Sequence, residues 1–251
     1  MYADASFSLI ADKYVAALLS SMDVDAEQAT SIQTLVRSEA DRADSGLAVA
    51  YHIGNLTVIR ADPALAADIA PLATPTKALT SDRFEQWAMA RNWRFIDGGD
   101  HHVIDRAGLH MRPLPSAAHL RELDREDLGD RILVAALLAA NDPDDVDEAE
   151  FAMDDLDPFI LGLINATGAL RVIVSGRVCD DDNDFDDIGV LTDEQLRGQG
   201  WGSAAVSAFC VASFKRGRLP LYRCAWSRTA SKALAMSLGF KLVGQVSAVG
   251  P

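Results

Sequence analysis

The spacing of apolar and polar residues divides the first hundred residues into a few short elements. Apolar positions at helical intervals predict three helices, and a proline suited to a first helical position predicts a short fourth one. These helices are expected over residues 5–22, 25–41 and 81–93, and from Pro63. Strands are expected over 47–53 and 56–61, joined by a "GN" turn, with a hairpin around Gly98 and Gly99. Residues 1–107 are therefore predicted to form a small domain of mixed α and β structure.

The same pattern predicts a second domain over residues 108–251. Its expected strands are 109–114, 168–178, 187–192, 219–226 and 241–249. Its expected helices are 116–141, 142–166, 200–217 and 227–240. Strands that alternate with helices in this order favour a mixed sheet covered by helices. The predicted fold class is α/β, of the mixed α+β kind.

Composition narrows the class of protein. The chain has 251 residues, of which 49% are hydrophobic and 24% charged, as is usual for a globular protein. No apolar run is long enough to cross a bilayer, and the N-terminus lacks a basic leader. Three cysteines form no closed disulfide set and match no metal pattern. We therefore expect a cytoplasmic protein without a membrane partner.

Charge is distributed unevenly along the chain. The net charge is −14, and residues 141–194 hold 17 acidic and 2 basic residues. Residues 195–251 hold 8 basic residues and no acidic ones. So acidic a chain is not expected to bind nucleic acid, whereas its basic tail could receive one small polyanion. The basic cluster "KRGR" is equally well explained as cations that end a helix.

The stretch "TDEQLRGQGWGS", residues 192–203, has chemistry of its own. Gly198, Gly200 and Gly202 stand between a predicted strand and a predicted helix. Free amides at a helix N-terminus bind phosphate, and glycines let it come close to the backbone. The nucleotide P-loop is excluded because no Lys and Ser/Thr pair follows. The dinucleotide pattern is excluded because no acidic residue occurs after Glu194.

The remaining pattern, R-x-x-G-x-G, resembles that of the GNAT superfamily of acetyl-coenzyme A-dependent N-acetyltransferases. The segment "IGVLTDEQLRGQGWGSAAVSAF" is similar to the family's fourth strand, pyrophosphate loop and third helix. Further on, "SRTASKALAMSLGF" is similar to its second signature. The resemblance covers roughly residue 108 to the C-terminus. It implies transfer of acetyl from acetyl-coenzyme A to a primary amine of a small molecule or peptide, without a metal.

The resemblance also implies which residues bind the cofactor. Leu191 and Thr192 would pair with the pantetheine arm, and backbone amides of the loop would cradle the pyrophosphate. The loop residues are Arg197, Gly198, Gln199, Gly200, Trp201, Gly202 and Ser203. Ser231 aligns with a helix serine that contacts the cofactor in the family. Lys232 either reaches the cofactor's phosphates or is an ordinary solvated lysine.

Catalytic roles follow from the same resemblance. The oxyanion donor would be the backbone N–H of Val190 or its neighbour, and the base would be a carboxylate upstream on the same strand. Asp186 and Asp187 are the candidates, and strand alternation lets only one face the acceptor. We favour Asp186, which shares a face with Val190. The alternative is that both carboxylates belong to a solvated acidic loop.

Two positions depart from the family pattern. The tyrosine that often serves as general acid is replaced by Ala235, and an asparagine before the helix serine is replaced by Arg228. Tyr222 or Cys224 could substitute, or could simply pack within the strand. A catalytically weakened acyl-coenzyme A-binding or regulatory module is therefore the competing function.

The acceptor and other partners are less defined. The acidic run "DDDNDFDD" lacks the glycine and glutamate of a calcium loop, but its charge would attract a cationic amine. His101 and His102 would face opposite sides of a strand and could not share a metal ion, so we expect a surface pair. A homodimer is left open.

Overall fold

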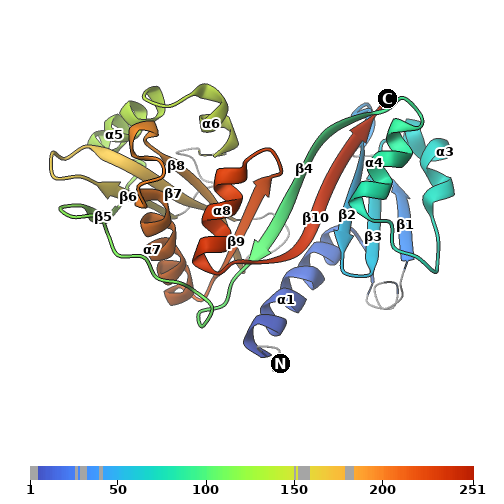
Figure 1. Ribbon diagram of the computed structural model, residues 1–251, viewed down its shortest axis with the longest axis horizontal. Helices are drawn as coiled ribbons and strands as arrows, with labels where there is room; N and C mark the ends of the chain where they lie inside the picture. The colour runs from blue at the N-terminus through green and yellow to red at the C-terminus, as the bar shows by residue number, and fades with distance from the viewer. Residues whose placement is uncertain are drawn as a thin grey trace. The chain divides into compact units, whose positions relative to one another are not determined.

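The chain forms two compact units that are interleaved in sequence (Figure 1). The computed structural model describes residues 5–25, 28, 33–39, 42–149, 151, 159–178 and 184–251. Unit 1 comprises Met1–Ile10, Val103–Tyr222 and Ala233–Lys241, and unit 2 comprises Ala11–His102, Arg223–Lys232 and Leu242–Pro251. No helix among the described residues is long and apolar enough to cross a membrane. Nor do these residues include a group of three His, Cys, Asp or Glu that could hold a metal ion.

Unit 1 is built on a sheet in the order β9-β8-β7-β6-β5. Its strands are β5 (His119–Glu122), β6 (Phe159–Ile164), β7 (Leu170–Val178), β8 (Phe185–Thr192) and the first part of β9 (Leu219–Ala225). Neighbouring strands are antiparallel from β5 to β8, and β9 is parallel to β8. This single parallel pair needs a crossover, which is helix α7 (Trp201–Lys215).

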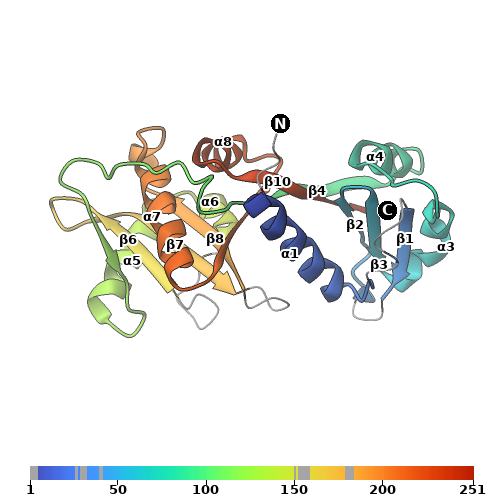
Figure 2. The same ribbon diagram turned by 90° about the horizontal axis from the view of Figure 1, so that it is seen from below.

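Helices cover both faces of this sheet (Figures 1 and 2). Helix α5 (Leu128–Ala139) is capped by Asp127, whose side chain accepts a hydrogen bond from the Asp130 amide. Buried residues of α5 pack against β6, β7 and Leu191 of β8. Small buried residues, alanine and serine among them, let α7 lie close to the sheet. The short helix α6 (Pro143–Glu148), the later part of α8 (Thr229–Leu238) and the start of α1 (Ala5–Ser21) also belong to this unit.

The strands of unit 2 follow one another in the order β1-β3-β2-β10-β4. Its strands are β1 (Gln33–Ser38), β2 (Ala48–Ile53), β3 (Leu56–Ala61), β4 (Arg94–Val103) and β10 (Lys241–Gly250). The strand pair β1·β3 is parallel, and β2 is antiparallel to both β3 and β10. The helical elements in this part of the sequence are α1 (Ala5–Ser21), η2 (Pro63–Leu65), α3 (Ala66–Ile69), η3 (Ala70–Leu72) and α4 (Ser81–Met89).

The predicted α/β class is confirmed, but several elements differ from the sequence-based expectation. Residues 33–38 lie in strand β1 rather than in the predicted helix 25–41, because they pair with β3; residues 26, 27, 29–32, 40 and 41 lie outside the described residues. No strand forms over 109–114. Strands β5 and β6 occupy segments predicted as helical, since a short apolar run such as "FILGLI" fits a buried strand equally well.

The predicted hairpin around Gly98 and Gly99 is a single continuous strand, β4. The expected surface pair is also wrong, because His101 and His102 are buried. The hydroxyl of Tyr14 lies 2.5 Å from Nδ1 of His101. Burial lowers the pKa of His101 to about 3. The two histidines are therefore part of the interior of unit 2.

Separate folding of residues 1–107 and 108–251 stays a prediction. Contacts group the residues differently, since unit 2 takes ten residues from each of two C-terminal segments, Arg223–Lys232 and Leu242–Pro251. Strand β9 and helix α8 each contribute residues to both units. A cut at residue 107 would therefore divide unit 2.

Candidate functional site

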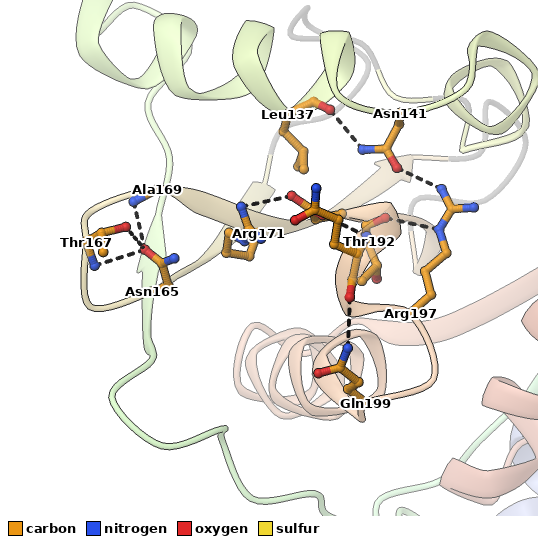
Figure 3. A network of polar contacts seen from close by, with 11 residues as sticks. Leu137, Asn141, Asn165, Thr167, Ala169, Arg171, Thr192, Arg197 and Gln199 are labelled. Carbon is orange, nitrogen blue, oxygen red and sulfur yellow. Dashed lines mark hydrogen bonds and ion pairs between the residues drawn. The ribbon is translucent and has the colours of Figure 1, made fainter.

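The turn after β8 is fixed by polar contacts to β7 (Figure 3). Asp193 accepts a hydrogen bond from the amide of Gln195 at 2.9 Å, which starts the short helix η4 (Glu194–Leu196). Its other oxygen pairs with Nη1 of Arg171 at 3.0 Å, and its amide donates to the Arg171 carbonyl at 2.8 Å. Gln199 Nε2 donates to the Gln195 carbonyl at 2.8 Å. The loop therefore leaves the sheet in one defined direction.

The three glycines of the loop are needed for two different reasons. Gly198 and Gly200 have φ angles of +72° and +84°, and a Cβ on either would meet no atom within 4 Å. Their backbone conformation and the open space beside them explain these two glycines. A Cβ on Gly202 would instead lie 2.8 Å from Oγ1 of Thr192 and 3.3 Å from Cδ1 of Leu234. Gly202 therefore allows α7 to start close to the end of β8.

Helix α7 presents the amides of its first turn beside this open space. Gly200 is its N-cap residue and has no side chain to cap it. Ala204 donates the first hydrogen bond of the helix, to the Gly200 carbonyl at 3.0 Å. The amides of residues 201–203 precede it and have no carbonyl one turn back inside the helix. Such a helix N-terminus favours an anion.

The side chain of Arg197 points to other elements of unit 1 (Figure 3). Its Nη1 pairs with Oδ2 of Asp145 at 2.7 Å, and its Nη2 donates to Oδ1 of Asn141 at 2.7 Å. Its Nε donates to the Thr192 carbonyl at 3.3 Å. Asn141 is buried and donates in turn to the Leu137 carbonyl at 2.8 Å. The guanidinium thus joins the loop to the end of α5 and to α6.

The pairing of β8 with β9 stops before β8 ends. Among the described residues of unit 1, the ladder consists of Phe185↔Leu219, Asp186↔Pro220 and Asp187↔Leu221. On its other side, β8 pairs with β7 as far as Thr192. The segment 188–192 therefore has one edge whose backbone groups are not used by β9. This edge leads directly into the glycine loop.

The two faces of β8 differ in what covers them. Asp186 and Thr192 face α7, because Asp186 accepts from Ser213 Oγ at 2.6 Å and Gly202 contacts Thr192. Leu191 faces α5, in a shared core. Gly189 faces the same way, and a Cβ on it would lie 2.4 Å from the carbonyl oxygen of Ala149, just after α6. By alternation Asp187 belongs to this second face.

Asp186 is a buried ion-pair partner. Its side chain is 1% exposed, and it pairs with Arg216 Nη2 at 2.7 Å and with Arg218 Nε. Arg216 in turn lies 3.4 Å from the ring centroid of Phe159. Both carboxylate oxygens are engaged, so these contacts favour a scaffold role over a base. The alternative of a solvated acidic loop is wrong, because Asp186 and Asp187 are both buried.

The other predicted cofactor contacts, Ser231 and Lys232, belong to unit 2. The Lys232 ammonium pairs with the fully buried Asp100, and a hydrogen bond from this pair raises the pKa of Lys232. Asp100 Oδ1 also accepts from Trp226 Nε1 and Gln245 Nε2, both at 2.8 Å. Lys232 is therefore not an ordinary solvated lysine, because its ammonium has Asp100 as a specific partner.

The candidate substitutes for the missing tyrosine are packed in the interior. Tyr222 is 1% exposed, and its ring lies 5.5 Å from that of Phe240 in an edge-on arrangement. Cys224 is buried as well. Ala235, at the position of the family's tyrosine, is fully buried. The packing interpretation of Tyr222 is thus supported by its surroundings.

Sequence reasoning missed the partners of Arg197. Asn141 and Asp145 lie 56 and 52 residues before it, and nothing in their local pattern marks them. Asp193 offered a signal, since an aspartate directly after a strand and two residues before Gln195 is suited to cap a turn. Gly189 offered another, because a glycine inside a strand often marks a close backbone approach.

Comparison with known proteins agrees with the sequence resemblance. The GNAT acetyltransferase family model matches residues 178–249. The fold is similar to a GCN5-related N-acetyltransferase from Sphaerobacter thermophilus, with TM-score 0.52, 15% identity, and coverage of 67% of this chain and 56% of that one. It is also similar to a GNAT-family acetyltransferase from Colwellia psychrerythraea, with TM-score 0.50, 12% identity, and coverage of 74% and 69%.

A tandem GNAT protein from the clavulanic acid biosynthesis pathway is similar with TM-score 0.50 and 15% identity, over 71% of this chain and 61% of that one. No curated protein matches the chain. At these identities the structures show a shared fold, and the family match covers the β8–loop–α7 segment and the α8 segment. Residues 178–249 therefore match the GNAT acetyltransferase family, and the fold is similar to that of solved acetyltransferases of this family.

Proposed function

We propose that the protein is an N-acetyltransferase that moves the acetyl group of acetyl-coenzyme A to a primary amine of a small molecule or peptide. The observation that carries this proposal is the free edge of β8, which continues without interruption into the glycine loop and the N-terminus of α7. A strand edge suits an extended amide-containing arm, and a helix N-terminus suits a pyrophosphate. Both lie in unit 1, inside the segment that matches the family.

The residues present fit such a cofactor. Backbone groups of Leu191 and Thr192 would pair with the pantetheine arm. The amides of Gly198 and of residues 200–203 would bind the phosphates, whereas the Gln199 amide donates to the Leu196 carbonyl at 3.3 Å. The N–H of Val190 would donate to the oxyanion that forms when the amine attacks the acetyl carbonyl. Bound acetyl-coenzyme A supplies the thioester that is attacked.

A base must also take a proton from the attacking amine. Of the two carboxylates predicted for this role, Asp186 is enclosed by arginines beneath α7. We therefore place the proposed base on the opposite face of β8, where Asp187 lies with Gly189. That face is the one next to α6.

We propose a cationic acceptor amine, because acidic side chains gather on α6 next to this face. Asp142, Asp144 and Asp147 are exposed there. Negative charge around a cleft attracts cationic ligands over distances near the Debye length. A cytoplasmic location and a homodimer stay predictions from the sequence.

The alternative, a catalytically weakened acyl-coenzyme A-binding module, is favoured by the buried Ala235 and the packed Tyr222. The two functions differ in turnover. Release of free thiol from acetyl-coenzyme A should be measured over a panel of primary amines. Release with any of them supports the transferase, and cofactor binding without release from any amine supports the alternative.

The cofactor site itself is tested by Gly200→Val with desulfo-coenzyme A in a calorimeter, which needs no turnover. Valine resists a φ of +84° and fills the space proposed for the phosphates. Loss of two or three amide contacts of roughly 1.5–3 kcal/mol each predicts at least a hundredfold weaker binding. The matched control is Gly168→Val, at φ +82° with equally open surroundings in the β6–β7 turn. Equal affinity in the two variants would remove the proposal.

A further inference from the structure

Helix α6 is anchored to unit 1 at both of its ends. At its start, Asp145 and the preceding Asn141 are held by the Arg197 guanidinium. Just after its end, the Ala149 carbonyl lies against Gly189 of β8, at a place where any side chain on residue 189 would collide with it. The helix therefore runs from the glycine loop to the residue next to Val190.

The Arg197 side chain contacts three separate parts of this arrangement. Nη1 reaches α6, Nη2 reaches the end of α5, and Nε reaches the carbonyl at the end of β8. A planar guanidinium supplies such donors in fixed directions, and an ammonium does not. The contact with Asn141 is partly buried, and Asn141 is itself tied to Leu137 of α5. The distances, all between 2.7 and 3.3 Å, leave the guanidinium committed to protein groups.

The resemblance to the family predicts that Arg197, the first residue of the glycine pattern, helps to bind the cofactor. Its backbone amide donates to the Glu194 carbonyl at 3.4 Å, and its side chain serves other elements of the protein. We propose that Arg197 is a positioning residue that holds α6 over β8 and thereby couples the glycine loop to the acceptor side. The coupling to the acceptor rests on the proposed function, whereas the hold on α6 does not.

Loss of the Arg197 guanidinium should therefore affect the position of α6 and leave phosphate binding unchanged. Removing the guanidinium leaves the loop amides and both positive-φ glycines in place, so phosphate binding is retained. It frees α6, a helix of six residues that is too short to persist by itself. The backbone around Ala149, which lies against Gly189 next to Val190, then loses its fixed position. Binding of the amine is weakened, and binding of the cofactor is not.

Hydrogen exchange on the full chain tests the hold on α6 without a ligand. The amides of Asp145 and Val146 donate to the Asp142 carbonyl, and that of Ala149 donates to the Asp145 carbonyl, each at 3.1 Å. In Arg197→Met and Arg197→Lys these amides should exchange at least about tenfold faster than in the unchanged protein. Asp145→Asn, which alters the partner of Arg197, should also make these amides exchange faster. The control is Arg131→Met, which removes an equal charge from the exposed side of α5.

Calorimetry with desulfo-coenzyme A on the same proteins tests whether cofactor binding is retained without the guanidinium. Arg197→Met should bind it with less than about a fivefold change, because amides and not the guanidinium meet the phosphates. If the amides of α6 exchange as slowly in Arg197→Lys as in the unchanged protein, a positive charge suffices without the planar guanidinium. That result overturns the positioning role. Unchanged exchange in Arg197→Met, or a fivefold or greater loss of affinity, also overturns it.

Turnover adds a readout that a general loss of stability would not produce. With a productive amine, Arg197→Met should raise the KM for the amine by about tenfold and leave the KM for acetyl-coenzyme A within fivefold. The reverse pattern overturns the coupling. If the unchanged protein does not bind desulfo-coenzyme A, the proposed function fails, while the exchange experiment still decides the role of Arg197.

Discussion

Gly98 of β4 lies so close to the indole of Trp226 that a Cβ on residue 98 would be 2.5 Å from Cε3 of that ring. The Trp226 amide donates to the Gly98 carbonyl at 2.8 Å, and the ring of Phe95 stacks on the indole with centroids 5.7 Å apart. Next to it, a Cβ on Gly99 would lie 2.9 Å from the Cys224 carbonyl oxygen. The two glycines thus admit the end of β9 and the turn that follows it.

Gly98→Ala should therefore destabilise the protein. The new methyl group cannot be placed without moving the indole, and overpacking of this kind costs about 1–3 kcal/mol. Urea unfolding followed by tryptophan fluorescence measures the loss. The matched control is Gly244→Ala in β10, where the nearest atom to the new Cβ lies at 3.5 Å. Equal stability of the two variants would mean that the indole adjusts freely.

Gly189→Ala should displace α6 without harming the cofactor site. Its Cβ would be 2.4 Å from the Ala149 carbonyl, which is backbone and cannot rotate away. We expect faster exchange at residues 145–149 and a change in desulfo-coenzyme A affinity of less than about fivefold. Exchange as slow as in the unchanged protein would show that α6 accommodates the methyl group.

Asp186→Asn should act on stability. The substitution leaves Arg216 and Arg218 beside a buried neutral amide, and breaking a buried ion pair costs roughly 3–5 kcal/mol. Thermal unfolding should show a large fall in Tm. Where folded protein can be recovered at low temperature, it should retain thiol-release activity. A fully folded variant without any activity would restore Asp186 as the base.

The stability of the protein should fall as the pH is lowered below 6.5. Burial lowers the pKa of His101 to about 3, so the unfolded chain binds a proton that the folded chain excludes. The contribution is present in full above 6.5 and is lost progressively toward pH 3, at about 1.4 kcal/mol per pH unit. Urea unfolding at pH 7.5 and 5.0 should differ by about 2 kcal/mol from this group. His101→Gln should show a smaller difference, and an equal one would assign the effect to other groups.

Local chemistry made the core of the candidate site predictable. Strand β8, the glycine loop and α7 are adjacent in sequence, and each carries its own signal: an apolar run, glycines on alternate positions, and helical spacing. The structure adds that Gly198 and Gly200 serve backbone conformation whereas Gly202 serves packing. That distinction depends on Thr192 and Leu234, which a glycine pattern does not reveal.

Contacts over long sequence separations could not be predicted in this way. Lys232 meets Asp100 across 132 residues, and Arg197 meets Asn141 across 56. Strand alternation predicts that Asp186 shares a face of β8 with Val190, but the sequence does not show that α7 covers Asp186. The two glycines of "DGGD" predict a hairpin turn, but in the structure they lie in strand β4 and permit the close approach of another chain segment.

Strand β10 joins its sheet through β2, with Gln245 opposite His52 and Val249 opposite Ala48. His52 Nε2 lies 3.1 Å from Ser247 Oγ, across 195 residues of chain. At about 5–20 residues per second, the ribosome delivers β10 roughly 10–40 s after β2. During that interval the edge of β2 that later pairs with β10 has no partner strand. Unit 2 therefore cannot complete its fold before β10 has been translated. We expect early release of the nascent chain to yield an aggregation-prone N-terminal fragment and late-acting chaperones to matter for its yield.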